Sequence, residues 1–171
     1  GLDQATTGSV AWPGLGERLR PGPIAMIFQG PSLLPPLTVA ENVALPLVLD
    51  GLRDADARKR AGAALELLDL GELADKLPEE ISGGQAQRVA VARALAGEPV
   101  LILADEPTGQ LDRANGAIVV DVLLHAAEHA GAALVVATHD PTVAARFATR
   151  WQMHSGQFAG PAVVTEHSWS R

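Results

Sequence analysis

The sequence predicts an α/β fold in which a mostly parallel sheet is flanked by helices. Unbroken apolar runs at residues 100–104 and 132–137 are typical of strands buried on both faces of a parallel sheet. Residues 112–130, which lie between these runs, carry apolar side chains with helical periodicity, as a crossover helix does. The composition agrees, because 47% of the 171 residues are hydrophobic, enough to build the core of one domain.

One further strand and a first helix are expected earlier in the chain. Residues 24–28 form an apolar run that ends in a Gln-Gly-Pro turn at Gln29, as a buried strand does where it enters a loop. Residues 38–49 are expected to be helical, because Thr38 and Glu41 have the spacing of a capping box.

The middle of the chain is predicted to be helical. A second helix is expected over residues 54–70 and should end at Gly71, and a third should follow Ser82-Gly83-Gly84 and run to about Ala96. No strand is evident in this part of the sequence. We therefore expect a single domain over residues 1–171, with a helical subdomain at about 38–97 inserted in its α/β core.

The end of the chain leaves two interpretations open. Residues 150–154 and 162–165 lie on either side of a Ser-Gly pair at Ser155. They are expected to form either a closing hairpin or two short strands.

Charge and composition argue against several kinds of function. The formal net charge is −7, and an acidic domain is a poor candidate for holding nucleic acid by its phosphates. The sequence has no cysteine, which excludes disulfides and thiolate metal sites and fits an intracellular protein. No apolar run approaches the ~18 residues of a membrane span, so we expect any membrane association to occur through a partner.

Two carboxylates follow the predicted strand at residues 100–104. Ligands of open α/β sheets bind at the carboxyl edge, so Asp105 is expected beside a bound phosphate, where it would hold Mg²⁺ directly or through water. Glu106 would face the attacking water as a general base or as a water-orienting group. Taken alone, a strand that ends in a charged turn explains these residues equally well.

A second candidate site stands at the start of the third helix. Gly83 and Gly84 allow backbone N–H groups to approach a ligand closely, and Ser82 offers a cap and a hydroxyl. The positive end of the helix dipole makes such a terminus a ready anion site. An ordinary helix cap after a glycine turn is the alternative interpretation.

Taken together, these motifs resemble those of the ABC ATPase family. Five of them occur in the family's order and at family-like separations: Phe28-Gln29 (Q-loop), ISGGQ from Ile81 (signature), LILADEP from Leu101 (Walker B), Gly109 to Asp112 (D-loop) and Thr138-His139-Asp140 (switch histidine). The resemblance covers essentially the whole chain and implies a P-loop NTPase-like fold that binds ATP and Mg²⁺.

The resemblance also implies roles for individual residues. Glu106 and His139 would be catalytic, with His139 reaching the γ-phosphate, and Asp105 and Gln29 would hold the metal. The residues implied to contact nucleotide are Gln29, Ser82, Gly83, Gly84, Gln85 and Asp112.

Two protein partners and a location follow from the same resemblance. A second nucleotide-binding subunit would pair head to tail with this one, so that each signature motif completes the other subunit's site. A transmembrane permease would face the segment that contains Leu33, Leu34 and Leu37, although core packing is the alternative for these leucines. The protein would be cytoplasmic and peripheral on the inner face of the plasma membrane, with no nucleic acid expected as a partner.

The sequence ADEPTGQLD, preceded by ENVALPL, resembles the subfamily that serves lipoprotein release, macrolide export and similar efflux. The expected function is therefore ATP hydrolysis that powers export or extraction of a substrate through the permease. A chromosome-maintenance or DNA-repair ATPase and a translation factor are the alternatives. The acidic charge and the short separation between Gln29 and the signature disfavour the DNA-linked class.

The phosphate-gripping Walker A loop, GxxxxGKS or GxxxxGKT, does not occur among the 171 residues. The opening segment resembles the part of the family just downstream of the Walker A helix, and the first residue is Gly1. We therefore expect a chain that lacks the first strand, P-loop and first helix and is weak or inactive alone. The alternative is a subunit that lends its signature motif in trans to a complete partner.

Overall fold

The computed structural model describes residues 5–9, 11, 14–15, 23–160 and 163–164. The chain divides into two compact units, Gly1–Ala137 and Thr138–Arg171, and each is considered by itself. The expectation of one domain with an inserted helical subdomain stays a prediction.

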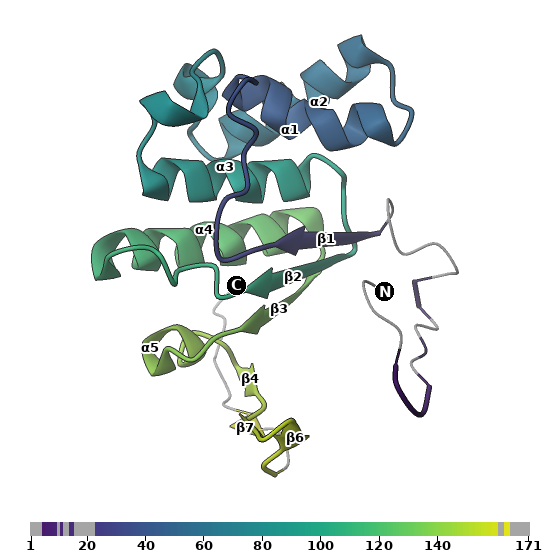
Figure 1. The fold of residues 1–171 in the computed structure, drawn as a ribbon, viewed down its shortest axis with the longest axis vertical. Helices are drawn as coiled ribbons and strands as arrows, with labels where there is room; N and C mark the ends of the chain where they lie inside the picture. Colours follow the sequence, from purple (N-terminus) through teal and green to yellow (C-terminus); the bar gives the residue numbers. More distant parts are fainter. Residues whose placement is uncertain (1–4, 10, 12–13, 16–22, 161–162, 165–171) are drawn as a thin grey trace. The chain divides into compact units, whose positions relative to one another are not determined.

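The first unit contains a parallel sheet of three strands. Their order is β1 (Ile24–Ile27), β2 (Leu101–Asp105) and β3 (Ala133–Ala137), and both pairs run parallel (Figure 1). The register places Ile27 of β1 beside Ala104 of β2. The predicted α/β fold with a parallel sheet is confirmed, and the carboxyl ends of the three strands share one edge.

The other regular elements described in this unit are helices: α1 (Val39–Leu49), α2 (Asp54–Leu67), η1 (Gly71–Leu73), η2 (Pro78–Glu80), α3 (Gly83–Leu95) and α4 (Arg113–Ala130). Figure 1 shows α4 along the sheet, α3 next to it, and α1 and α2 further out. The central helix is α3, which contacts α1, α2, α4 and β1. Between residues 38 and 97, all of them described, the regular elements are helical, as predicted.

The ends of the helices follow local sequence signals. The Thr38 N–H donates to Glu41 Oε2 at 2.9 Å and the Glu41 N–H donates to Thr38 Oγ1 at 3.3 Å, which confirms the predicted capping box of α1. Gly131 ends α4 in the left-handed conformation, with φ 61°. The predicted end of α2 is wrong, because the helix stops at Leu67 and Asp69 takes a φ of 54° that a right-handed helix does not allow.

The hydrophobic core lies on one face of the sheet. Ile27, Ile102 and Ala104 are buried there and belong to the same cluster as Val89 of α3 and Leu123 of α4. The prediction that the strands are buried on both faces is wrong for β3. Burial alternates along this strand, and its exposed positions are Ala133, Val135 and Ala137. Since α3 and α4 pack over one face, alternate β3 side chains of the described sheet point to a face that these helices do not cover.

The second unit consists of a short helix and two antiparallel strand pairs. Helix α5 spans Pro141–Ala144, β4 (Thr149–Arg150) pairs with β7 (Val163–Val164), and β5 (Met153–His154) pairs with β6 (Gln157–Phe158). The Ser-Gly pair at 155–156 turns between β5 and β6 with two positive φ angles. A hairpin is therefore present, but it joins residues 153–154 to 157–158 and not to the predicted strand at 162–165, of which residues 163–164 pair with β4 instead. Residues 162 and 165, which bounded part of the prediction, lie one on each side of β7 and outside the described residues.

Candidate functional site

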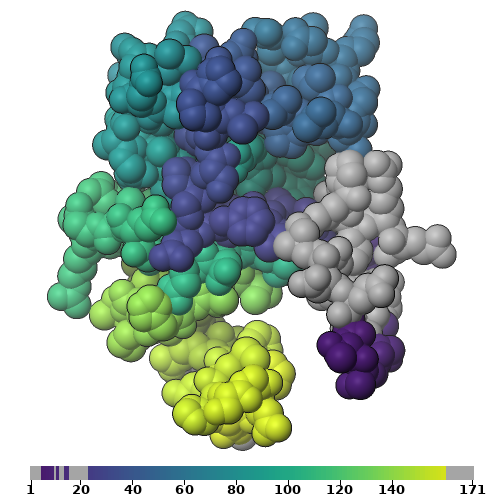
Figure 2. Space-filling model, viewed as in Figure 1, coloured from purple at the N-terminus to yellow at the C-terminus, as the bar shows by residue number. Residues whose placement is uncertain are grey.

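The carboxyl edge of the sheet in the first unit brings Gln29 close to the segment that follows β2. Gln29 stands two residues beyond β1 and is exposed, and Figure 2 shows the blue-purple segment that follows β1 at the surface of this unit. Its side chain lies directly over Gly109, where an added Cβ would be 2.8 Å from Gln29 Nε2. Glycine is therefore needed at residue 109 if the glutamine is to keep this position. Two of the predicted motifs, the Q-loop and the D-loop, are thus in contact.

The two carboxylate residues occupy different backbone positions at this edge. Asp105 is the last residue of β2 and its side chain is exposed, whereas Ala104 before it is buried. Glu106 has a φ of 44°, an uncommon conformation for a residue other than glycine. Its N–H donates to the Ala137 carbonyl at 2.9 Å and its carbonyl accepts from the Gly109 N–H at 3.0 Å. These two bonds hold the turn in which Glu106 leaves the strand.

Ser82 caps α3 through a reciprocal pair of hydrogen bonds. The Gln85 N–H donates to Ser82 Oγ at 3.2 Å, and the Ser82 N–H donates to Gln85 Oε1 at 2.8 Å. The predicted cap by Ser82 is therefore present. The structural role of Gln85 was not predicted, although the Ser-x-x-Gln spacing of a capping box signals it. Ser82 itself is exposed at the helix start, where the helix dipole favours an anion.

The glycines of the signature motif pack against the start of α4. A Cβ on Gly84 would lie 2.9 Å from Asn115 Oδ1, closer than real Cβ contacts. Asn115 is fixed in turn by Asp112, which accepts from the Asn115 N–H at 2.9 Å and from its Nδ2 at 2.7 Å. These two hydrogen bonds lower the pKa of Asp112, and the bond from the Asn115 backbone N–H has a larger effect than the bond from its side-chain amide. The signature motif and the D-loop helix therefore meet within this chain, a contact that the sequence pattern did not reveal.

His139 belongs to the second unit and is described with it. It is exposed, and in the chain it stands two residues beyond the end of β3. The turn around it is ordered by Asp140, whose Oδ1 accepts from the Thr142 N–H at 2.7 Å and whose own N–H donates to Thr138 Oγ1 at 3.1 Å. The catalytic role of His139 stays a prediction.

The donor atoms at the edge of the first unit suit a magnesium–phosphate ligand. Among the residues that the structure describes, no three His, Cys, Asp or Glu side chains are grouped to hold a metal by themselves. Magnesium in phosphoryl-transfer sites uses one or two protein oxygens and completes its shell with water and phosphate oxygens. An exposed Asp105 carboxylate and the Gln29 amide oxygen fit this sparse donor set.

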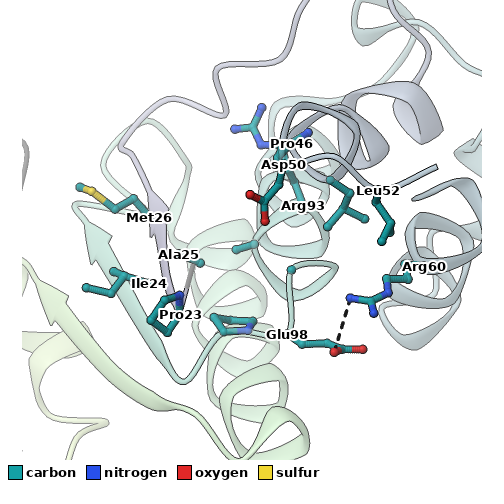
Figure 3. Close-up of a pocket in the computed structure, with 14 residues that line it drawn as sticks. Pro23, Ile24, Ala25, Met26, Pro46, Asp50, Leu52, Arg60, Arg93 and Glu98 are labelled. Carbon is teal, nitrogen blue, oxygen red and sulfur yellow. Dashed lines mark ion pairs between the residues drawn. The ribbon is translucent and has the colours of Figure 1, made fainter. Parts of the chain in front are cut away.

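A cavity of about 450 Å³ in the same unit lies away from this edge (Figure 3). It is lined by the amino-terminal part of β1, including Pro23 and Ile24, and by Glu98 just before β2. Arg60 and Glu98 form an ion pair at its rim, with 3.4 Å between Nη1 and Oε2. Neither Asp105 nor Gln29 is among the residues that line the cavity, so it is separate from the candidate site.

Comparisons of sequence identify relatives of one kind. A family model described as "ABC transporter" matches residues 1–109. The chain is 41% identical over 165 residues to the lipoprotein-releasing system ATP-binding protein LolD of Alcanivorax borkumensis, covering 91% of this chain and 72% of that protein. It is 40% identical over 166 residues to the uncharacterized ABC transporter ATP-binding protein YbbA of Escherichia coli K12, covering 92% of this chain and 73% of that protein.

Comparisons of structure agree. The dimeric ATP-binding cassette MJ0796 bound to ADP and Pi matches with a TM-score of 0.70 and 37% identity, over 84% of this chain and 63% of that chain. The cassette cbiO1 from Clostridium perfringens, part of the ABC transporter complex cbiONQ, matches with a TM-score of 0.75 and 29% identity. That match covers 83% of this chain and 57% of cbiO1, so the chain spans less than two thirds of either cassette.

Proposed function

The chain belongs to the family of ABC transporter ATP-binding subunits, and from this premise we propose that it helps to hydrolyse ATP in a complex that exports or extracts a substrate through a membrane permease. The observation that carries the proposal is the carboxyl edge of the sheet, where Gln29 lies on the loop that follows Asp105 and Glu106. The similarity to LolD favours lipoprotein release as the process.

The side chains at this edge have separate tasks in the proposed reaction. Asp105 and Gln29 supply oxygens to a hydrated Mg²⁺, and Mg²⁺ when bound offsets the negative charge of the phosphate oxygens. Glu106 orients a water molecule and accepts its proton as the water oxygen bonds to the γ-phosphorus. The bond from that phosphorus to the bridging oxygen then breaks, which leaves ADP and phosphate. We propose that His139 donates to a γ-phosphate oxygen.

The capped start of α3 serves a nucleotide in a different way. Ser82, Gly83 and Gly84 are proposed to face the nucleotide held by a second subunit in a head-to-tail dimer, with Gln85 fixing the turn. An exposed hydroxyl at a positive helix end suits a terminal phosphate. We propose that Asp112 contributes through the Asn115 contact beside Gly84. The dimeric form of the similar cassette MJ0796 supports this arrangement.

The permease is proposed to contact the loop between β1 and α1. Leu34 is 45% exposed and Phe28 is 42% exposed, whereas Leu33 packs against the core and Leu37 is half-buried. Core packing therefore accounts for part of the predicted patch, and Leu34 is its exposed member. No helix in the described residues is long and apolar enough to cross a membrane. A peripheral position on the inner face of the plasma membrane follows from the proposed permease contact.

The 171 residues by themselves are proposed to hydrolyse ATP weakly. GxxxxGKS or GxxxxGKT, which would supply the phosphate-gripping loop, is not among them. A second candidate is a subunit that lends its signature to a complete partner, favoured by the fully formed Ser82 cap. ATP turnover by the purified 171-residue chain at rates typical of enzymes would contradict both expectations.

Affinity purification from native membranes tests the permease assignment. The tagged protein should bring a permease with it, and Leu34→Glu should reduce the recovered permease severalfold because it places a charge on the exposed contact. Leu49→Glu is the matched control, since Leu49 is 77% exposed at the far end of α1. Recovery of ribosomes without a permease, or equal permease recovery with both variants, would refute the assignment.

A further inference from the structure

Two side chains of α3 hold the backbone of the loop that carries Gln29. Gln87 Nε2 donates to the Phe28 carbonyl at 3.0 Å. Arg93 donates from Nη1 and Nη2 to the carbonyls of residues 32 and 31, at 2.9 and 2.8 Å. The three acceptors lie on both sides of Gln29 along the chain. Helix α3, which begins with the signature motif, is therefore hydrogen-bonded to this loop before and after Gln29.

Gln87 and Arg93 have limited access to solvent, so water does not easily replace their hydrogen bonds to the loop. Gln87 is only 1% exposed, and a buried amide that loses its partner is costly. Arg93 is half-buried, and its planar fork reaches two carbonyls at once, which the single ammonium of lysine does not. The two residues are six positions apart on α3, so together they hold a length of loop and not a single point.

The neighbouring part of the loop has a different anchor. Asn42 of α1 bonds to the backbone of residues 34, 37 and 38. Loosening the α3 contacts should therefore free residues 28–32 without releasing residues 34–38. The side chain of Gln29 rests on Gly109, so a shift of residues 28–32 displaces it from the loop after β2.

We propose that Gln87 and Arg93 are positioning residues that set the place of Gln29 by tying its loop to α3, so that this loop and the signature helix move as one body. The hydrogen bonds from Gln87 and Arg93 to the loop are contacts within this chain. Their consequence for nucleotide chemistry rests on the proposed function. In an assembled transporter, loosening these contacts should lower kcat more than it raises KM, because Gln29 is proposed to hold the metal of the reacting nucleotide.

Electron paramagnetic resonance on a nitroxide at Ser32→Cys tests the tie without nucleotide. The chain has no cysteine of its own, so a single label is possible, and Ser32 is exposed. Arg93→Lys keeps the charge but loses the fork, and Gln87→Met keeps the length but loses the donor. Arg88→Lys is the matched control, since Arg88 is a half-buried arginine on the same helix.

We expect both test variants to increase the mobile fraction of the nitroxide spectrum and the control to leave it unchanged. Amide hydrogen exchange of residues 34–38 and of α4 should stay the same, which shows that the variants keep their fold. Either test variant alone suffices if the other does not fold. Unchanged spectra in the folded variants, or an equal change in Arg88→Lys, would overturn the proposal. Because this experiment uses no ATP, it tests the contacts between α3 and the loop even if the proposed function is wrong.

Discussion

Replacement of Asn42 by aspartate tests how the loop between β1 and α1 is held. Asn42 is 1% exposed, and its side-chain oxygen accepts from the Leu34 N–H at 2.7 Å. Its Nδ2 donates to the carbonyls of Leu34, Leu37 and Thr38 at 3.1, 2.9 and 3.0 Å. Asn42→Asp keeps the shape of the side chain but turns the donor atom into an oxygen that faces three carbonyl oxygens.

The expected loss of stability follows from these contacts. The two N–H groups of Nδ2 share these three acceptors, so about 1 kcal/mol for each N–H gives about 2 kcal/mol, and the buried negative charge adds to that loss at neutral pH. Burial and the carbonyl oxygens should raise the pKa of the new carboxyl above its unfolded value of about 3.9. The folded state then binds more protons than the unfolded state between these two values. Stability should therefore rise relative to wild type as the pH falls through the raised pKa.

Urea unfolding followed by circular dichroism at pH 7 and pH 5 measures both effects. Asn42→Ala serves as the comparison, since it removes the donated bonds, together with the bond accepted from the Leu34 N–H, without adding a charge and should show no such pH dependence. An Asn42→Asp variant that loses less than about 1 kcal/mol at pH 7, and whose difference from wild type is the same at both pH values, would refute this reasoning.

Two other predictions concern the contact between the signature motif and the D-loop helix. Gly84→Ala should lower the melting temperature, because the added Cβ would lie 2.9 Å from Asn115 Oδ1. This loss should outweigh the preference of a helix for alanine over glycine, which is up to about 1 kcal/mol. Thermal unfolding checks this, with Gly62→Ala as the control, since Gly62 is an α2 glycine with open space around it. The carboxyl of Asp112 should titrate below its ordinary 3.8 in an NMR pH series, and Asn115→Ala should raise its pKa. Since the folded pKa is lowered, the contribution of Asp112 to stability should be present above the unfolded pKa and lost as the pH falls through the folded one.

Each of these two predictions would be contradicted by a specific result. A Gly84→Ala variant as stable as Gly62→Ala would mean that Asn115 moves aside without cost. An Asp112 titration that Asn115→Ala leaves unchanged would mean that the asparagine does not determine the charge at the start of α4.

Local signals in the sequence were sufficient for much of the fold. The capping-box spacing at Thr38 and the cap residue Ser82 predicted where α1 and α3 begin, because an N-cap is a contact between residues three apart. The predicted helix at 112–130 matches α4, which ends at Gly131 because a left-handed residue favours glycine. Such features depend on a few neighbouring residues and can be read without the tertiary structure.

The faces of β3 could not be predicted in the same way. The run Ala-Leu-Val-Val-Ala has no polar residue, so its periodicity does not tell a strand covered on both faces from one covered on a single face. The left-handed conformation of Asp69, which ends α2 early, has no strong signal either, because aspartate also occurs inside helices.

At the candidate site, the sequence predicted the position of individual residues at the sheet edge, but it did not predict their contacts with residues far away in the chain. Asp105 follows a buried strand and Gln29 follows another, and a parallel sheet places both at one edge. The contacts of Gly84 with Asn115 and of Gln87 with Phe28 join residues 31 and 59 positions apart. Contacts at such separations depend on how helices pack against each other, and no local pattern in one sequence encodes them.

Glu106 gives the most direct test of the central claim that this chain supplies catalytic groups for ATP hydrolysis. Glu98 is a matched control, because it flanks the other end of β2 and also has a positive φ, 52° against 44° for Glu106. The measurement is ATP turnover at saturating Mg²⁺-ATP by the protein assembled with its permease. We predict that Glu106→Gln lowers turnover about a hundredfold or more while Glu98→Gln leaves it unchanged. Equal turnover by the two variants would contradict the account.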